Sequence, residues 1–195
     1  MCSSDLGLYA AGEAGPGVSL TFCIVSGECS GRYASWYARE AAQVELEEED
    51  LKWIAKKQQE ARGFLNAEPN TMGDPRDIKK DIKETMWTFV GTLRTDHELQ
   101  KGLQELDRIE KERLPNLFAK YVRNLREVYE VTNMVLVSKM IAESARFRTE
   151  RRGLHQRLDY PREDNVNWLK NVILQASEGG MRLFTRPVNL IWEKP

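Results

Sequence analysis

Three consecutive apolar stripes with helical spacing restrict the fold of this chain more than any other feature. Their members recur every three to four residues: Ile78, Ile82, Met86, Phe89, Val90 and Leu93; then Leu99, Leu103, Leu106 and Ile109; then Leu117, Tyr121, Leu125, Val128, Val131, Val135, Met140 and Ile141. Helices joined by short connections bury such stripes against one another. The sequence therefore predicts a mainly α fold, with an antiparallel three-helix bundle over residues 74–148.

The boundaries of these helices carry their own signals. Asp74 is a suitable N-cap, and Pro75 suits the first helical position. Thr95 and Glu98 form a capping-box pattern that starts the second helix. The third stripe predicts one long helix over about 116–148.

A dense charged segment follows the bundle, with the sequence TERRGLHQRLDYPREDNVNW over residues 149–168. Charged networks at domain junctions commonly serve as scaffolding. We therefore expect a network that docks the helices, with any catalytic role secondary. Arg152 and Arg157 are predicted to form bidentate ion pairs. Their candidate carboxylate partners are Glu150, Asp159 and Asp164.

The end of the chain reads as β structure. The run KNVILQ over 170–175 predicts a strand, and a Gly-containing turn separates it from further strand-like runs over 181–186 and 188–192. Residues 149–195 are thus expected to form a charged connector and a terminal β-hairpin.

The N-terminal part is less regular. We interpret residues 1–6 as an artefact, because they resemble the translation of a common sequencing adapter. Residues 7–43 contain a short apolar strand ending in Gly12-Glu13, then a helix from Ser19 that is rich in small residues. Those small residues suit either approach to a flat partner or close helix packing. Residues 44–73 predict a charged linker helix and a loop.

Composition excludes several classes of function. The net charge of −1 provides no basic field for nucleic acid, and no apolar run is long enough for a membrane span. Three cysteines argue against a disulfide framework and suit a reducing compartment, and no metal-ligand spacing is present. Of the two histidines, His97 is expected to be exposed, and His155 to have a perturbed pKa. No residue is nominated as catalytic.

A resemblance appears in the charged segment. It is similar to E-S-R-G-x-H-x-R-x-D-Y-P-x-x-D-x-x-x-W, which ends the helical C-terminal domain of succinate dehydrogenase and fumarate reductase flavoprotein subunits. The ten matching residues are Glu150, Arg152, Gly153, His155, Arg157, Asp159, Tyr160, Pro161, Asp164 and Trp168. The serine position holds Arg151. The Gly12-Glu13 turn and the Ser19-Leu20 pair resemble the late flavin-binding motif of the same proteins.

This resemblance implies a C-terminal fragment of an FAD-dependent oxidoreductase, in which residues 7–43 are the C-terminal remnant of an FAD-binding domain. It implies Glu13, Ser19 and Leu20 as cofactor-binding residues. It implies an iron–sulfur partner subunit, a small-molecule substrate, and a cytoplasmic location with membrane association through partner subunits. The adenylylsulfate reductase α subunit is a sister possibility. The alternative is a non-catalytic helical interaction module, which has no need of the strand, turn and small-residue helix over 7–40.

Two departures from the family pattern lead to further expectations. The dinucleotide fingerprint G-x-G-x-x-G is absent, so we expect that this chain alone does not hold FAD tightly. Dicarboxylate-processing members carry H-G-A-N-R in a longer loop before the Ser-Leu pair. Here only five residues separate Glu13 from Ser19, and none is Arg, His or Asn. We therefore expect a substrate other than a plain C4 dicarboxylate.

Overall fold

The computed structural model describes residues 2–3, 9–11, 19–41, 45–178 and 180–188 of the 195-residue chain. The chain divides into two compact units, Met1–Trp53 and Ile54–Pro195. None of the described helices is both long enough and apolar enough to cross a bilayer. The finer predicted division, at residues 6, 43, 73 and 148, stays a prediction.

The first unit consists of a minimal sheet and one long helix. Strand β1 (Cys2–Ser3) pairs antiparallel with β2 (Tyr9–Ala10), and helix α1 (Leu20–Glu40) follows. The hydroxyl of Ser19 caps α1 by accepting a hydrogen bond from the Phe22 N–H at 3.2 Å. The next helix, α2 (Glu48–Asn66), continues into the second unit.

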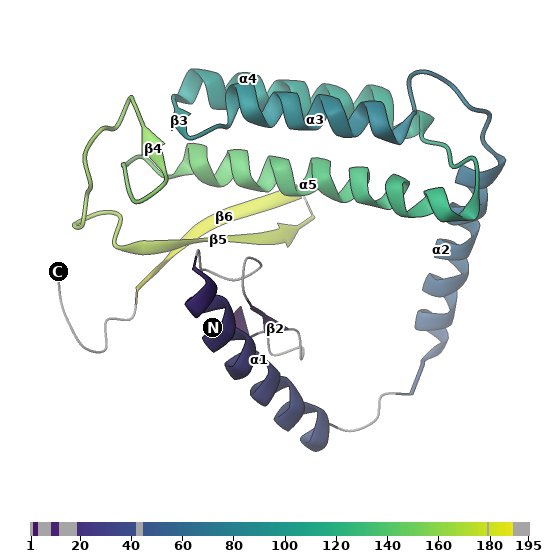
Figure 1. Ribbon diagram of the computed structural model, residues 1–195, viewed down its shortest axis with the longest axis horizontal. Helices are drawn as coiled ribbons and strands as arrows, with labels where there is room; N and C mark the ends of the chain where they lie inside the picture. The colour runs from purple at the N-terminus through teal and green to yellow at the C-terminus, as the bar shows by residue number, and fades with distance from the viewer. Residues whose placement is uncertain (1, 4–8, 12–18, 42–44, 179, 189–195) are drawn as a thin grey trace. The chain divides into compact units, whose positions relative to one another are not determined.

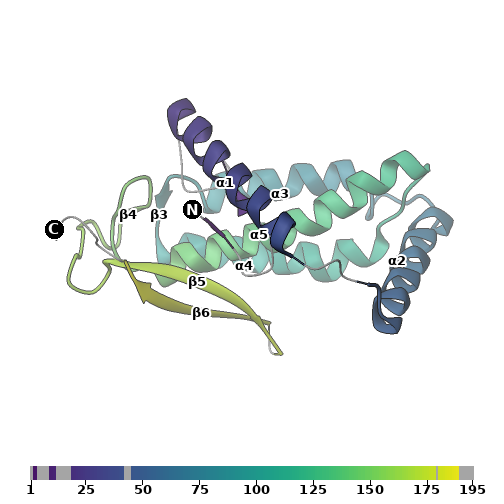
Figure 2. The same ribbon diagram turned by 90° about the horizontal axis from the view of Figure 1, so that it is seen from below.

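Three helices form the centre of the second unit (Figure 1, Figure 2). Helices α3 (Pro75–Phe89), α4 (Asp96–Arg108) and α5 (Leu125–Phe147) each contact the other two. The mainly α prediction is confirmed. Both predicted starts are also present, because Asp74 accepts from the Arg76 N–H at 2.9 Å and Thr95 from the Glu98 N–H at 3.2 Å.

The core between these helices is apolar and almost fully enclosed. Its buried members are Ile78, Ile82, Leu106, Ile109, Leu117, Ala119, Val128, Val131 and Val135, with Val90, Leu99, Leu103, Ala142 and Ala145 in a second cluster. Burying one large aliphatic side chain contributes about 1.5–3 kcal/mol. Phe64 of α2 also packs against this core, and its carbonyl accepts from the Ala119 N–H at 2.8 Å.

The third helix differs from its prediction in both start and face. The predicted start at residue 116 is wrong, because α4 passes through a π-helical turn and two short 3₁₀ turns intervene before α5 begins at Leu125. Tyr121 and Ile141, assigned to the inner face, are 51% and 44% exposed. The buried row of α5 is instead Val128, Val131, Val135, Ser138, Ala142 and Ala145. The buried residues of its second half, Ser138, Ala142 and Ala145, are small.

Two glycines mark places where the backbone permits no side chain. A Cβ atom built on Gly73 would lie 1.7 Å from the Asn116 carbonyl oxygen, so any other residue would force the chain apart. The Asn70 side chain fastens this crossing, since it accepts from the Gly73 N–H at 2.7 Å and donates to the Asn116 carbonyl at 3.0 Å. At Gly102, a Cβ atom would lie 2.9 Å from Phe89 Cβ, where α3 and α4 cross.

The chain ends in β structure that contacts α5. Strands β5 (Lys170–Ser177) and β6 (Gly180–Pro187) pair antiparallel from Lys170↔Pro187 to Ser177↔Gly180, which confirms the hairpin. Both strands contact α5. The predicted strand-like run over 188–192 lies almost wholly outside the described residues. A second pairing joins β3 (Leu93–Arg94) in parallel to β4 (Gln156–Arg157), and so ties the charged segment to the start of α4.

Candidate functional site

Arg157 is the centre of the charged segment and is only 1% exposed. Its Nη1 donates to the carbonyls of Ala145, Arg146 and Arg148 at 2.9, 3.1 and 3.2 Å. The last carbonyls of a helix have no partner within the helix, and the helix dipole places negative partial charge there. Arg157 therefore closes the C-terminus of α5.

Asp159 joins this helix end to the beginning of another. The Arg157 guanidinium donates to its two oxygens at 2.7 and 2.6 Å, a bidentate pair. The same carboxylate accepts from the N–H of Asp96, the first residue of α4, at 2.8 Å. The hydrogen bonds from Arg157 lower the pKa of Asp159 to about 2. One ion pair thus links the end of α5 to the start of α4.

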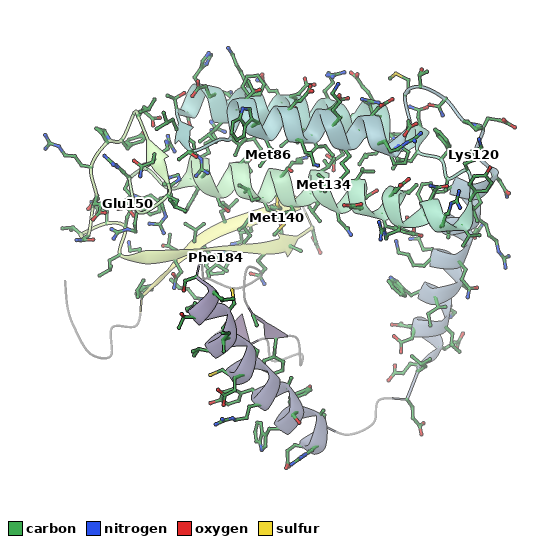
Figure 3. The ribbon with its side chains drawn as sticks, viewed as in Figure 1. Met86, Lys120, Met134, Met140, Glu150 and Phe184 are labelled. Atoms are coloured by element: carbon green, nitrogen blue, oxygen red, sulfur yellow. The ribbon has the colours of Figure 1, made fainter. Side chains whose placement is uncertain are left out.

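Glu150, labelled in Figure 3, is the second buried charge. Its side chain is 0% exposed. Arg152 donates to both of its oxygens, at 2.7 and 2.9 Å, and the Asp164 N–H donates at 2.9 Å. Arg148 is a further donor. Burial by itself raises the pKa of the Glu150 carboxyl, but these hydrogen bonds outweigh burial and hold the pKa below its usual value. The carboxylate is therefore charged and fixed from three directions.

Arg148 also connects the charged segment to the hairpin. It donates to the carbonyl of Trp168 at 3.1 Å, and its guanidinium lies 5.1 Å from the Trp168 ring centroid, within the range of a cation–π contact. Trp168 in turn donates from Nε1 to the Thr149 hydroxyl at 3.0 Å, and Phe147 meets its ring edge-on at 5.8 Å. These contacts fix the position of Trp168, two residues before β5 begins at Lys170.

His155 lies between two arginines. Its Nδ1 is 2.8 Å from Nη1 of Arg94, and its Nε2 is 3.2 Å from the Arg148 carbonyl. A guanidinium can only donate, so Nδ1 accepts, and Nε2 carries the proton that is donated to the carbonyl. Burial lowers the pKa of His155, and the positive charges of Arg94, Arg157 and Arg148 lower it further. The ring is therefore held neutral. The predicted perturbation of the His155 pKa is thus a lowering.

The predicted bidentate roles of Arg152 and Arg157 are confirmed, with Glu150 and Asp159 as their partners. Arg94 also belongs to this hydrogen-bond network, and the sequence analysis did not identify it. It lies 61 residues before His155, and it also donates to the carbonyl of Gly91 at 2.7 Å, just beyond the end of α3. No local pattern indicates this role, because it depends on the pairing of β3 with β4.

The predicted flavin-binding residues lie in the first unit. Glu13 lies outside the described residues. Ser19 caps α1, and Leu20 begins that helix with a side chain that is 78% exposed. Within the described ranges, no three His, Cys, Asp or Glu side chains gather as metal ligands would.

The chain is similar in sequence or in fold to several known oxidoreductases. A protein of Methanocaldococcus jannaschii named as an uncharacterized FAD-dependent oxidoreductase is 28% identical over 188 residues, covering 91% of this chain and 33% of its own length. Escherichia coli quinol fumarate reductase superposes with a TM-score of 0.76 at 26% identity, covering 91% of this chain and 31% of the reductase chain. Adenylylsulfate reductase of Archaeoglobus fulgidus, at 15% identity and a TM-score of 0.71 over 90% of this chain and 30% of its own, shares the fold.

The chain spans about a third of the length of these relatives. The family described as fumarate reductase flavoprotein C-term matches residues 79–194, which is more than half of the chain. That range contains α4, α5, the entire charged segment and the hairpin. The chain therefore belongs to the fumarate reductase flavoprotein C-terminal family.

Proposed function

We propose that this chain is the C-terminal part of an FAD-dependent oxidoreductase flavoprotein subunit of the fumarate reductase and succinate dehydrogenase superfamily. The observation that carries the proposal is the charged segment over 149–168, whose ten family-matching residues include the buried Glu150 and Arg157. The name of the Methanocaldococcus jannaschii relative, an FAD-dependent oxidoreductase, supports FAD as cofactor. In the whole protein, electrons pass between the flavin and an iron–sulfur partner subunit, in the cytoplasm or at a membrane reached through further subunits.

The first unit provides residues that fit a flavin. Glu13 would accept hydrogen bonds from ribityl hydroxyls, and Ser19-Leu20 would lie beside the ring at the start of α1. A methyl group added at Gly27 or Gly31 would meet no other described residue within 4 Å, so this face of α1 has room for a flat group. When bound, FAD supplies the redox chemistry. The chain's own residues supply position and electrostatics.

The charged segment has a positioning role in this proposal. Arg152 and Arg157 are hydrogen-bonded to the carboxylates of Glu150 and Asp159, and Arg157 also to the end of α5. The ring nitrogens of His155 contact Arg94 and the Arg148 carbonyl. Such a network fixes the helices that the rest of the flavoprotein contacts. We assign no catalytic step to it.

Flavin retention tests the proposal. The chain extended by its upstream coding sequence should purify with stoichiometric yellow flavin, whereas the 195-residue chain should not, because the pyrophosphate-binding glycine turn is absent from it. In the extended protein, Glu13→Ala should release flavin. Glu28→Ala, which removes only an exposed pair with Arg32, is the control. Failure of the extended protein to bind flavin would favour the helical interaction module instead.

The substrate forms a separate prediction. Because the five residues between Glu13 and Ser19 contain no Arg, His or Asn, the planar donor fork that suits a substrate carboxylate is missing from this loop. Steady-state assays of the extended, flavin-loaded protein with fumarate and with succinate should therefore show no ordinary turnover. Rates of about 1–10³ per second on either acid would contradict the prediction.

A further inference from the structure

An open cleft lies beside α5 in the second unit and has a volume of about 490 Å³. Its walls are largely apolar and come from α5 and β5: Val137, Met140, Ile141, Val172 and Leu174. Figure 3 shows Met140 between α5 and the hairpin. Sites for small molecules typically measure roughly 300–1,000 Å³ and combine apolar walls with a few convergent polar groups. Here the polar residues of the lining are Arg94, Ser144, Arg148 and His155.

Arg94 lies outside the charged segment in sequence and, unlike Arg148, Arg152 and Arg157, has no carboxylate partner among the described residues. Arg157 pairs with Asp159, and both Arg148 and Arg152 pair with Glu150. Arg94 instead donates to the carbonyls of Val90 and Gly91 and to His155, and among the described residues no Asp or Glu forms an ion pair with it. These three acceptors carry no net charge.

The surroundings of Arg94 disfavour the charged form of its guanidinium. The side chain is half-buried, and burial followed by the nearby charge of Arg157 lowers its pKa. A buried charge is stabilised by an opposite charge at hydrogen-bonding distance. Arg94 thus provides a positive charge without a carboxylate partner among the residues that line this apolar cleft.

We propose that this cleft is a binding site for small carboxylates that carry an apolar tail. The carboxylate would pair with the Arg94 guanidinium, and the tail would lie along Val137, Met140 and Ile141. His155 is fixed by its two hydrogen bonds, so it holds Arg94 in place. The residues of this site include none of those proposed for FAD.

Binding can be measured on the whole 195-residue chain with octanoate as the probe. The ¹³C-labelled methyl group of Met140, assigned by its loss in Met140→Leu, should shift saturably in NMR spectra. A probe of this size should give a Kd on the order of millimolar. Octylamine, of equal length and opposite charge, should bind at least about tenfold more weakly. Succinate, which has no tail, should leave the signal unmoved.

Two variants test the two halves of the site. Arg94→Gln should weaken octanoate binding about tenfold, the effect of losing one charge-assisted hydrogen bond. Arg94 also supports the end of α3, so a second variant is needed. Val137→Glu places a negative charge on the cleft wall and should abolish octanoate binding. Its matched control is Leu136→Glu, since Leu136 and Val137 are adjacent on α5 and both 50% exposed, but only Val137 lines the cleft.

Three results would overturn the proposal. One is a Met140 signal that does not shift, or does not saturate, with octanoate. Another is equal affinity for octanoate and octylamine, because Arg94 would then contribute no selectivity. The third is equal loss of binding in Val137→Glu and Leu136→Glu, which would assign the effect to overall charge and not to the cleft.

Discussion

The apolar core and the charged segment bury their central residues to the same degree by opposite means. Ile78 and Leu106 in the core are 0% exposed, as is Glu150, and Arg157 is 1% exposed. In the core, stabilisation comes from apolar area removed from water, which has no direction. In the charged segment, each group depends on particular partners at particular distances, because an unpaired buried charge is very costly.

This difference determines how each region responds to change. A core position accepts another apolar residue of similar volume at small cost. The position of a buried carboxylate that accepts from two arginines and a backbone N–H tolerates almost no substitution. Removing the carboxylate leaves each of these donors without its acceptor. Equal burial therefore does not imply equal tolerance of substitution, and variants at three positions, Glu150, Leu106 and His155, probe the two regions.

The largest effect is expected at Glu150. Glu150→Ala leaves the guanidiniums of Arg148 and Arg152 without their carboxylate, and breaking a buried ion pair in this way costs about 3–5 kcal/mol. Urea unfolding of the chain, followed by circular dichroism, measures the loss. Glu84→Ala is the matched control, because its pair with Lys80 is exposed on both sides and should contribute at most about 0.5 kcal/mol. A similar small loss at both sites would show that the charged segment does not stabilise the fold.

The second test concerns Leu106 in the core. Leu106→Ala should lower the free energy of unfolding by about 2–5 kcal/mol, because it leaves a cavity among Ile78, Ile109 and their neighbours. Leu106→Met should cost less than about 1.5 kcal/mol. Glu150→Asp is just as conservative chemically, yet it should cost more than Leu106→Met, because the shorter side chain cannot reach all of its donors. The reverse order would break the comparison.

The smallest effect concerns His155 and pH. The pKa of His155 is lowered in the folded chain, so below about pH 6.5 the unfolded chain binds a proton that the folded chain does not. Stability is therefore complete above that pH and falls as the solution becomes more acidic. The slope should stay below roughly 1.4 kcal/mol per pH unit, since one histidine binds at most one proton.

His155→Gln should flatten the dependence of unfolding free energy on pH between about 6.5 and 5. His97→Gln is the control, because His97 is the other histidine of the chain and is exposed in the first turn of α4. An equal change in both variants would exclude His155 as the source of the acid sensitivity.

Local signals explain what could be predicted from the sequence. The starts of α3 and α4 follow from Asp74 and Thr95, since a cap and an apolar stripe act within one helical turn. The start of α5 could not be predicted in this way, because its apolar stripe continues back through residues that the structure places in short turns and extended chain. Its buried row was missed where Ser138 and Ala142 replace large apolar residues.

In the charged segment, too, some contacts could be predicted from the sequence and others could not. Arg152 and Arg157 lie two residues from their carboxylate partners, so their pairing could be predicted from sequence spacing. The contacts of Arg157 with the end of α5 and of Arg94 with His155 depend on tertiary folding, and no sequence periodicity indicates them. The flavin-binding assignment of Glu13, Ser19 and Leu20 stays a prediction.

The position of Arg157 and Asp159 in the chain has a consequence for biosynthesis. The ribosome synthesises α4 and α5 before it adds Arg157 and Asp159, because those two residues follow the C-terminal end of α5 at Phe147. Until then, the first N–H of α4 and the last carbonyls of α5 lack the partners that they have in the finished fold. The helices can pack their apolar faces before then. The hydrogen bonds that connect the end of α5 to the start of α4 form only once Arg157 and Asp159 have been added.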